Sequence, residues 1–261
     1  MRVTVDGAAI DVLDEGRGPA VVLLHGFPLA KEIWDAQAAA LSRAARVVRP
    51  DLRGLGRSAV TPGPVLMQTL AADVAGVLDA LGIERAAVVG HSLGTYVAFS
   101  FYRLFAERVT AIGLVCGRPD ADDAATRERR EALASRAESE GIGPVADFYL
   151  PRLFAPAAYG SSDAPERVAA MCAATDPRGA AAVLRGMGLR SSSEDILGEI
   201  DVPVRVVAGA DDGLIPIAVQ RSMAAAIPGA AFDVVAGGHM PMLEAPAALT
   251  AALERLVADA G

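Results

Sequence analysis

The sequence predicts an α/β fold in which a mostly parallel sheet of eight strands carries helices on both faces and an inserted helical lid. Three observations predict it. Short apolar runs without polar alternation recur along the chain, as in strands buried on both faces. Helical stretches join these runs, as the crossovers of a parallel sheet require. Between residues 117 and 201 the alternation stops and only helical pieces remain.

The first predicted element is an antiparallel hairpin. Arg2–Val5 and Ala8–Asp14 read as strands and flank an Asp6-Gly7 pair, which favours a tight turn. Further strands are expected at Ala20–Leu24, Ala45–Arg49, Ala86–Gly90, Ala111–Val115, Val204–Gly209 and Ala231–Val235. We expect right-handed crossovers between these strands.

The crossover helices are marked by their end signals. Gly82 suits the position after a helix, and Pro246 suits a first helical turn. The predicted helices are Gln68–Leu81, Leu93–Phe105, Ala218–Ile227 and Pro246–Ala258.

The segment at 118–200 is too long for a loop. Its helical pieces are Asp122–Glu140, Val145–Leu153, Pro165–Ala174 and Arg178–Leu189. We therefore expect a helical lid at 118–200 over the end of the sheet, and a core formed by residues 1–117 and 201–261.

Charge and hydropathy exclude several classes of protein. The net charge of −8 disfavours binding to nucleic acid. No apolar stretch reaches the roughly 20 residues of a membrane-spanning helix, and the first residues lack the pattern of a signal peptide. A cytoplasmic protein is expected, with no membrane partner and with an oligomeric state that the sequence does not predict.

Charged residues also crowd one predicted helix of the lid. Its arginines alternate with glutamates, which is typical of a salt-bridged face turned to solvent. The residues concerned are Arg127, Arg129, Arg130, Arg136, Glu128, Glu131 and Glu138.

The two cysteines predict neither a disulfide framework nor a metal site. Cys116 and Cys172 lie far apart, and no Cys/His spacing typical of a metal site is present. Cys116 ends an apolar run and is expected to be a small buried side chain. We expect no metal and no organic cofactor.

The sharpest motif is Gly90-His91-Ser92-Leu93-Gly94, which matches G-x-S-x-G between a predicted strand and a predicted helix. The two glycines permit a tight turn that exposes the Ser92 hydroxyl beside free N–H groups at the helix start. Ser92 is therefore the candidate nucleophile.

A serine nucleophile needs a base, and the chain contains three histidines. His91 neighbours Ser92, so its side chain points elsewhere, and His25 ends a strand. His239, just after the last predicted strand, remains as the candidate general base.

The acid that orients the base is expected after a late strand. Asp211 and Asp212 both follow the strand at Val204–Gly209, and the pattern of the residues does not choose between them. The other aspartate is expected to cap a turn or helix.

The order Ser92, then Asp211 or Asp212, then His239 resembles that of the α/β-hydrolase superfamily. The resemblance to the superfamily's G-x-x-D-x-x-x-P pattern favours Asp212. His25-Gly26-Phe27-Pro28 resembles the oxyanion loop of these enzymes, which implies that the backbone N–H groups of Phe27 and Leu93 form an oxyanion hole.

A fourth segment, the residues DLRGLGRS at 51–58, also resembles a loop of this superfamily. A catalytic part for Asp51 or Arg53 is the weaker interpretation. The favoured one is a glycine-rich turn pinned by an Asp51–Arg53 pair.

Serine at position 92 separates the chain from the superfamily's dehalogenases and epoxide hydrolases, which carry aspartate there. It predicts a serine hydrolase that cleaves a small or medium carboxylic ester through an acyl-enzyme on Ser92. The alternatives are an enol-lactonase or other lactone hydrolase, and a perhydrolase similar to the cofactor-free haloperoxidases. A catalytically silent ligand-binding protein is the non-enzyme alternative.

The lid is expected to choose the small-molecule ester or lactone substrate. Its aromatic residues Phe148 and Phe154, with Met240 beside the base, are the candidate substrate contacts. These side chains predict an apolar mouth that favours an uncharged substrate.

Overall fold

The computed structural model describes residues 1–260. Its sheet has eight strands in the order β1-β2-β4-β3-β5-β6-β7-β8. The strands are β1 (Arg2–Val5), β2 (Ala8–Gly16), β3 (Ala20–Leu24), β4 (Arg46–Pro50), β5 (Ala86–His91), β6 (Val109–Val115), β7 (Val204–Gly209) and β8 (Ala231–Val235). Strand β2 is antiparallel to both β1 and β4, and all other pairs are parallel. The predicted α/β fold with a mostly parallel sheet is confirmed.

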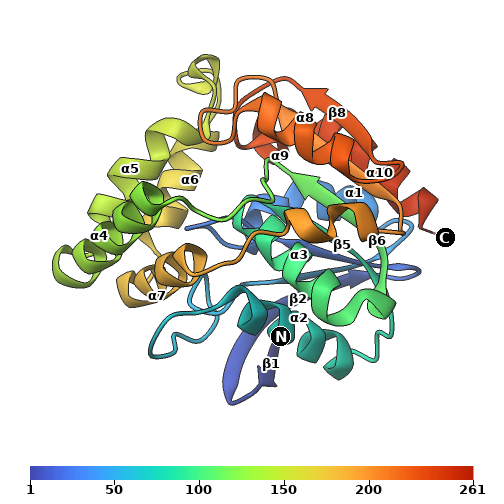
Figure 1. Cartoon of the computed structure of the whole chain (residues 1–261), viewed down its shortest axis with the longest axis horizontal. Helices are drawn as coiled ribbons and strands as arrows, with labels where there is room; N and C mark the ends of the chain where they lie inside the picture. The colour runs from blue at the N-terminus through green and yellow to red at the C-terminus, as the bar shows by residue number, and fades with distance from the viewer. Residues whose placement is uncertain (261) are drawn as a thin grey trace.

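Helices cover both faces of the sheet (Figure 1). Helices α2, α3 and α8 pack on one face, and α1 and α10 pack on the other. Outside the inserted segment the α-helices are α1 (Asp35–Leu41), α2 (Met67–Ala80), α3 (Leu93–Phe105), α8 (Ile217–Ala226), α9 (Pro241–Glu244) and α10 (Pro246–Asp259). Short 3-10 helices lie at Lys31–Trp34, Ala106–Arg108, Pro156–Ala158 and Glu194–Glu199.

Strand β3 shows why the apolar runs form strands. Val22 and Leu24 belong to the core beneath α2 and α3, whereas Val21 and Leu23 belong to the core beneath α1 and α10. Successive side chains of a strand point to opposite faces, so a strand covered on both sides is apolar throughout.

An all-helical segment lies between β6 and β7, as the sequence predicts. Its α-helices are α4 (Ala124–Glu140), α5 (Gly143–Leu153), α6 (Ala164–Ala173) and α7 (Pro177–Gly188). They gather on one side of the molecule, away from the C-terminus (Figure 1). Asp123 directly precedes α4, and its carboxylate accepts a hydrogen bond from the Thr126 N–H at 2.8 Å and so caps the helix.

Helix α1 is absent from the sequence-based prediction. It has seven residues and joins β3 to β4 together with the turn at Lys31–Trp34. Two helical turns provide too little periodicity to be detected, and Trp34, fully buried before α1, fixes the segment to the core instead. Among the helices of residues 1–260, none is long and apolar enough to span a membrane.

Candidate active site

Ser92 occupies the sharp turn between β5 and α3. Its backbone has φ 51° and ψ −110°, outside the usual regions for a residue with a side chain. Added methyl groups show why glycines flank it: a Cβ at Gly90 would lie 2.1 Å from the Gly94 carbonyl oxygen, and one at Gly94 would lie 2.4 Å from the Leu24 oxygen. The close packing of β3, β5 and α3 therefore holds the strained turn in place.

Two backbone N–H groups are free beside this turn. Within residues 1–260, neither the N–H of Phe27 nor that of Leu93 has a hydrogen-bond acceptor. Leu93 is the first residue of α3, where the positive end of the helix dipole lies. Two such donors can stabilise a developing oxyanion.

Asp212 and His239 form a buried pair. The Nδ1 atom of His239 lies 2.9 Å from Oδ2 and 3.0 Å from Oδ1 of Asp212, and both side chains are almost fully shielded from solvent. The carboxylate also accepts N–H bonds from Leu214 and Ile215, each at 2.9 Å. Asp211, in contrast, is exposed. The geometry therefore pairs Asp212, and not Asp211, with the candidate base.

The surroundings of Asp212 keep it ionised. Burial raises the pKa of this carboxyl, but the charge and hydrogen bond of His239 and the N–H groups of Ile215 and Leu214 outweigh that effect. The pKa of Asp212 therefore lies below its ordinary value. An ionised carboxylate on Nδ1 leaves Nε2 of the imidazole free to accept a proton.

His239 contacts the residue that precedes Ser92. The rings of His91 and His239 lie 4.9 Å apart, and His91 Nε2 lies 2.8 Å from the His239 carbonyl oxygen. Burial and the neighbouring His239 lower the pKa of His91 to about 3, so His91 is neutral at pH 7. Nε2 of His239 is buried and has no hydrogen-bond partner in residues 1–260, Ser92 included. Such catalytic bonds often shorten only when substrate binds.

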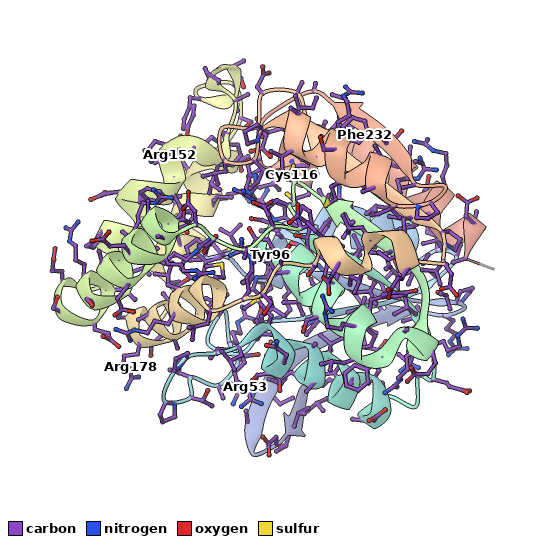
Figure 2. The ribbon with its side chains drawn as sticks, viewed as in Figure 1. Arg53, Tyr96, Cys116, Arg152, Arg178 and Phe232 are labelled. Carbon is purple, nitrogen blue, oxygen red and sulfur yellow. The ribbon has the colours of Figure 1, made fainter. Side chains whose placement is uncertain are left out.

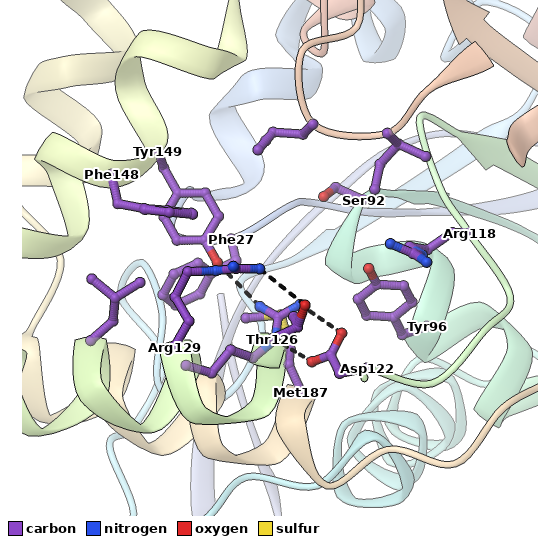
Figure 3. Close-up of a pocket in the computed structure, with 14 residues that line it drawn as sticks. Phe27, Ser92, Tyr96, Arg118, Asp122, Thr126, Arg129, Phe148, Tyr149 and Met187 are labelled. Carbon is purple, nitrogen blue, oxygen red and sulfur yellow. Dashed lines mark hydrogen bonds and ion pairs between the residues drawn. The ribbon is translucent and has the colours of Figure 1, made fainter. Parts of the chain in front are cut away.

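Ser92 lines a cavity of about 700 Å³, measured with its opening to solvent. Figure 3 shows Ser92 and Tyr96 on one side of it, and Phe148, Tyr149 and Arg129 on the other. The remaining lining residues are Phe27, Arg118, Asp122, Thr126, Arg130, Leu133, Met187, Leu214 and Ile215. The expectation of an apolar mouth is wrong, because three arginines and an aspartate share the wall with the aromatic rings.

Comparison with known proteins identifies the chain's relatives. Residues 21–253 match the alpha/beta hydrolase family. The chain belongs to this family. A solved esterase of Thermogutta terrifontis, with malate bound, is 33% identical and superimposes with a TM-score of 0.96 over 100% of this chain and 98% of that one. An enol-lactonase of Burkholderia xenovorans LB400 is 27% identical with a TM-score of 0.91, over 99% and 100% of the two chains.

Curated relatives of this alpha/beta hydrolase carry several activities. RutD of Caulobacter sp. strain K31, a candidate carbamate hydrolase, is 32% identical over 96% of this chain and 95% of its own length. An epoxide hydrolase of Siraitia grosvenorii is 36% identical, but the match covers 42% of this chain and 36% of that protein. The chain thus spans about a third of the first epoxide hydrolases that it matches.

Of the three predicted substrate contacts of this alpha/beta hydrolase, Phe148 lines the cavity and the other two do not. Phe154 turns into the core and packs edge-on against Tyr159, with ring centroids 6.1 Å apart. Met240 is fully buried in the core beneath α1 and α10. Both side chains lie where the sheet meets the helices, and close packing there buries them in the core instead of exposing them at the cavity wall.

The loop at 51–58 is structural and is held differently from the prediction. Asp51 does not pair with Arg53: its carboxylate accepts hydrogen bonds from Lys31 Nζ at 2.6 Å and from the Arg57 N–H at 2.8 Å. Arg53 instead binds Asp73 of α2, with Nε 2.8 Å from Oδ2. Neither residue lines the cavity.

The arginine-rich face of α4 is only partly a solvent face. Arg136 pairs with Glu140 at 2.8 Å, and Glu131 and Glu138 both bind Arg185 of α7. Arg130, however, turns inward and binds Asp122. The prediction of a salt-bridged face turned to solvent is therefore wrong for Arg130, while the pairs of Arg136, Glu131 and Glu138 agree with it.

Glu244 is a polar residue that the sequence analysis missed. Its Oε1 accepts N–H bonds from Gly238 at 2.8 Å and Met240 at 3.2 Å, on either side of His239. Its Oε2 accepts one from Ala155, beyond α5, at 2.9 Å. The signal was available in the sequence: a carboxylate six residues after Gly238 and four after Met240 can bond back to the N–H groups on either side of His239.

Cys116 also lies closer to the site than its sequence suggests. Figure 2 shows it near the middle of the molecule, and its Sγ lies within 4.8 Å of donor atoms of Asp212 and His239. Burial and the Asp212 charge raise the pKa of this thiol well above its usual value. A metal ion here would have to displace the proton of Cys116 and the Asp212–His239 bond, so the donor set does not favour one.

Proposed function

We propose that the chain is a serine hydrolase that cleaves small or medium carboxylic esters through an acyl-enzyme on Ser92. The observation that carries the proposal is the buried Asp212–His239 pair, whose second imidazole nitrogen is unpartnered beside the strained turn of Ser92. A carboxylate paired with an imidazole, together with a serine hydroxyl, supplies the groups that acyl transfer needs.

In the proposed mechanism, Nε2 of His239 takes the proton of the Ser92 hydroxyl as Oγ attacks the ester carbonyl. The N–H groups of Phe27 and Leu93 donate to the oxygen that becomes negative. His239 then protonates the departing alkoxide, which leaves an acyl group on Oγ. Water, deprotonated by His239, attacks that acyl group, and Ser92 recovers its proton when the carboxylic acid is released.

Serine favours esters over epoxides despite the partial match to epoxide hydrolases. A carboxylate that opens an epoxide forms an ester, which water can cleave. A serine oxygen would form an ether, and an ether has no carbonyl for water to attack. An acyl substrate instead leaves an ester on the serine oxygen, and water can cleave that ester.

Residues 118–200 are proposed to act as the lid of this site. Helices α4 and α5 supply Arg129, Phe148 and Tyr149 to the cavity wall opposite Ser92. A substrate in the cavity would therefore be enclosed between this segment and the core, which restricts water near the acyl-enzyme.

A lactone hydrolase is the second candidate. Its support is the likeness to an enol-lactonase, at 27% identity over 99% of this chain. A lactone is a cyclic ester, so the same residues would perform the same steps and the alcohol would remain joined to the acyl group.

The test is hydrolysis of a panel of acyl esters, lactones and carbamates, with Ser92→Ala as the blank. Ester cleavage should fall by roughly 10⁶-fold in the variant, as expected for loss of a nucleophile. Higher kcat/KM on lactones than on any ester would replace the ester assignment with the lactone one. Equal inertness of both proteins on all substrates, with no labelling of Ser92 by a fluorophosphonate, would reject the proposal.

A further inference from the structure

The cavity beside Ser92 carries positive charge in a protein whose net charge is −8. Its wall contains three arginines and one aspartate, Asp122. Asp122 binds two guanidinium groups. Arg130 from α4 lines the cavity and pairs with Asp122, and Arg190, which does not line the cavity, contacts Asp122 Oδ1 at 2.8 Å. The buried part of this cluster therefore holds two cations for one anion.

Arg118, at one edge of the cavity, is already paired. Its Nε donates to Asp120 Oδ1 at 2.8 Å. Its charge is largely neutralised by that neighbour.

Arg129 has no such partner. Its Nη2 donates to the Thr126 hydroxyl at 3.0 Å, and its guanidinium lies 5.6 Å from the centre of the Phe148 ring. No ion pair of residues 1–260 includes Arg129, whereas Arg118 and Arg130 each have a carboxylate. Figure 3 shows its guanidinium directed into the cavity, across from Ser92.

We propose that the cavity selects an ester whose acyl chain ends in a carboxylate, and that Arg129 binds this carboxylate. The inference rests on the proposed ester hydrolysis at Ser92. A guanidinium without an ionic partner can bind a carboxylate through two parallel N–H bonds. The neighbouring rings of Phe148 and Tyr149 offer an apolar surface that suits the methylene chain between the two ends.

Two matched esters test the charge alone. The 4-nitrophenyl monoester of adipic acid carries a terminal carboxylate, and the 4-nitrophenyl ester of adipic acid monoamide is its uncharged counterpart of the same length. The wild type should show a kcat/KM for the carboxylate ester at least about tenfold above that for the amide, the effect of one charge-assisted hydrogen bond. Arg129→Gln should remove most of this ratio, and Arg129→Lys should restore part of it.

Arg127→Gln is the matched control. Arg127 lies on α4 two residues before Arg129, is exposed and does not line the cavity, so the change removes the same charge elsewhere. The ratio between the two esters should keep its wild-type value in this variant. An equal fall in Arg127→Gln and Arg129→Gln, or a wild-type ratio near one, would overturn the proposal while leaving ester hydrolysis intact.

Titration calorimetry with adipate tests the carboxylate site independently of ester hydrolysis, so failure of the carboxylate site can be told apart from failure of the proposed function. If the wild type hydrolyses neither ester, tenfold weaker adipate binding by Arg129→Gln than by the wild type still supports the carboxylate site. Absence of adipate binding to the wild type overturns it. Unchanged thermal unfolding of Arg129→Gln shows that any loss does not come from misfolding.

Discussion

His239 is held by bonds to several parts of the molecule. Its side chain bonds to Asp212, and its backbone N–H donates to the Leu153 carbonyl at 2.8 Å. Its carbonyl faces His91, and Glu244 binds the N–H groups of the residues on either side of it. These hydrogen bonds together fix the position of the His239 imidazole, and a functional site needs such support to hold its geometry.

Glu244 is a positioning residue whose removal should lower kcat more than it raises KM. In Glu244→Gln the amide NH₂ would face a backbone N–H at one end, so at least one of the three bonds is lost and the His239 loop shifts. We expect kcat to fall about tenfold, since small displacements of a base are costly. Steady-state kinetics on an ester measures this.

Glu254→Gln, on the exposed side of α10, is the matched control and should keep the wild-type kcat. A Glu244→Gln enzyme with normal kcat and a raised KM would contradict the positioning role. A fall in kcat together with a marked drop in the temperature of thermal unfolding would indicate a purely structural role for Glu244.

At the scale of elements, a buried cluster of charged side chains links α4 to the core, beside the apolar contacts of its buried face. The side chain of Asp122, just before α4, is 2% exposed and binds Arg130 of α4 and Arg190, which follows α7. Arg190 also lies over the Tyr96 ring of α3, 4.0 Å from its centre. Through these contacts, Asp122 connects α4 and the segment after α7 to α3, the helix that follows Ser92.

Asp122→Asn should lower the free energy of unfolding by about 3 kcal/mol, because it leaves two buried guanidinium groups without their anion. Urea unfolding followed by circular dichroism measures this. Asp123→Asn is the control: Asp123 is exposed at the N-cap of α4, where asparagine caps as well as aspartate. Equal stability of the two variants would show that the Asp122 pairs contribute nothing net.

For the whole molecule, buried carboxylates set the stability in acid. The pKa of Asp122 lies below its usual value: burial opposes this, but Arg130 and Arg190 outweigh it. The pKa of Asp212 is lowered as well. A group whose pKa is lower in the folded state stabilises the fold above its unfolded pKa, and that stabilisation is lost as pH falls through the folded pKa. Asp73, whose pKa burial raises, acts in the opposite direction.

The free energy of unfolding should therefore decrease as pH falls below about 4, the ordinary pKa of aspartate. Urea titrations at a series of pH values measure the slope. Asp122→Asn should show a shallower slope than the wild type, because one of the groups that must take up a proton is gone. An identical slope in both proteins would mean that the pKa of Asp122 is the same in the folded and unfolded states, contrary to the expectation.

The strands and the residues at their ends could be predicted from sequence because the patterns that mark them lie within a few neighbouring residues. A strand covered on both faces must be apolar throughout, and Gly90 and Gly94 mark the turn at Ser92 directly. The choice of Asp212 over Asp211 needed the family pattern, since neighbouring turn residues look alike until the chain is folded.

What could not be predicted depends on packing between distant elements. Arg129 and Arg130 are adjacent on α4, yet one faces the cavity without an anion and the other binds Asp122. Which side of α4 meets the core is set by α7 and by Arg190, far along the chain. The partner of Arg53 was missed for the same reason, because Asp73 enters from a helix that no local pattern connects to that loop.

The bonds of His239 to Leu153 and of Glu244 to Ala155 also restrict how substrates enter. Leu153 ends α5 and Ala155 lies just beyond it, so these two bonds join the end of that helix to the loop of His239. In the proposed mechanism, an outward movement of this end would carry His239 away from Ser92 and stop ester hydrolysis. We therefore expect substrate to enter and product to leave on the side of the cavity formed by α4, because movement there leaves the position of His239 unchanged.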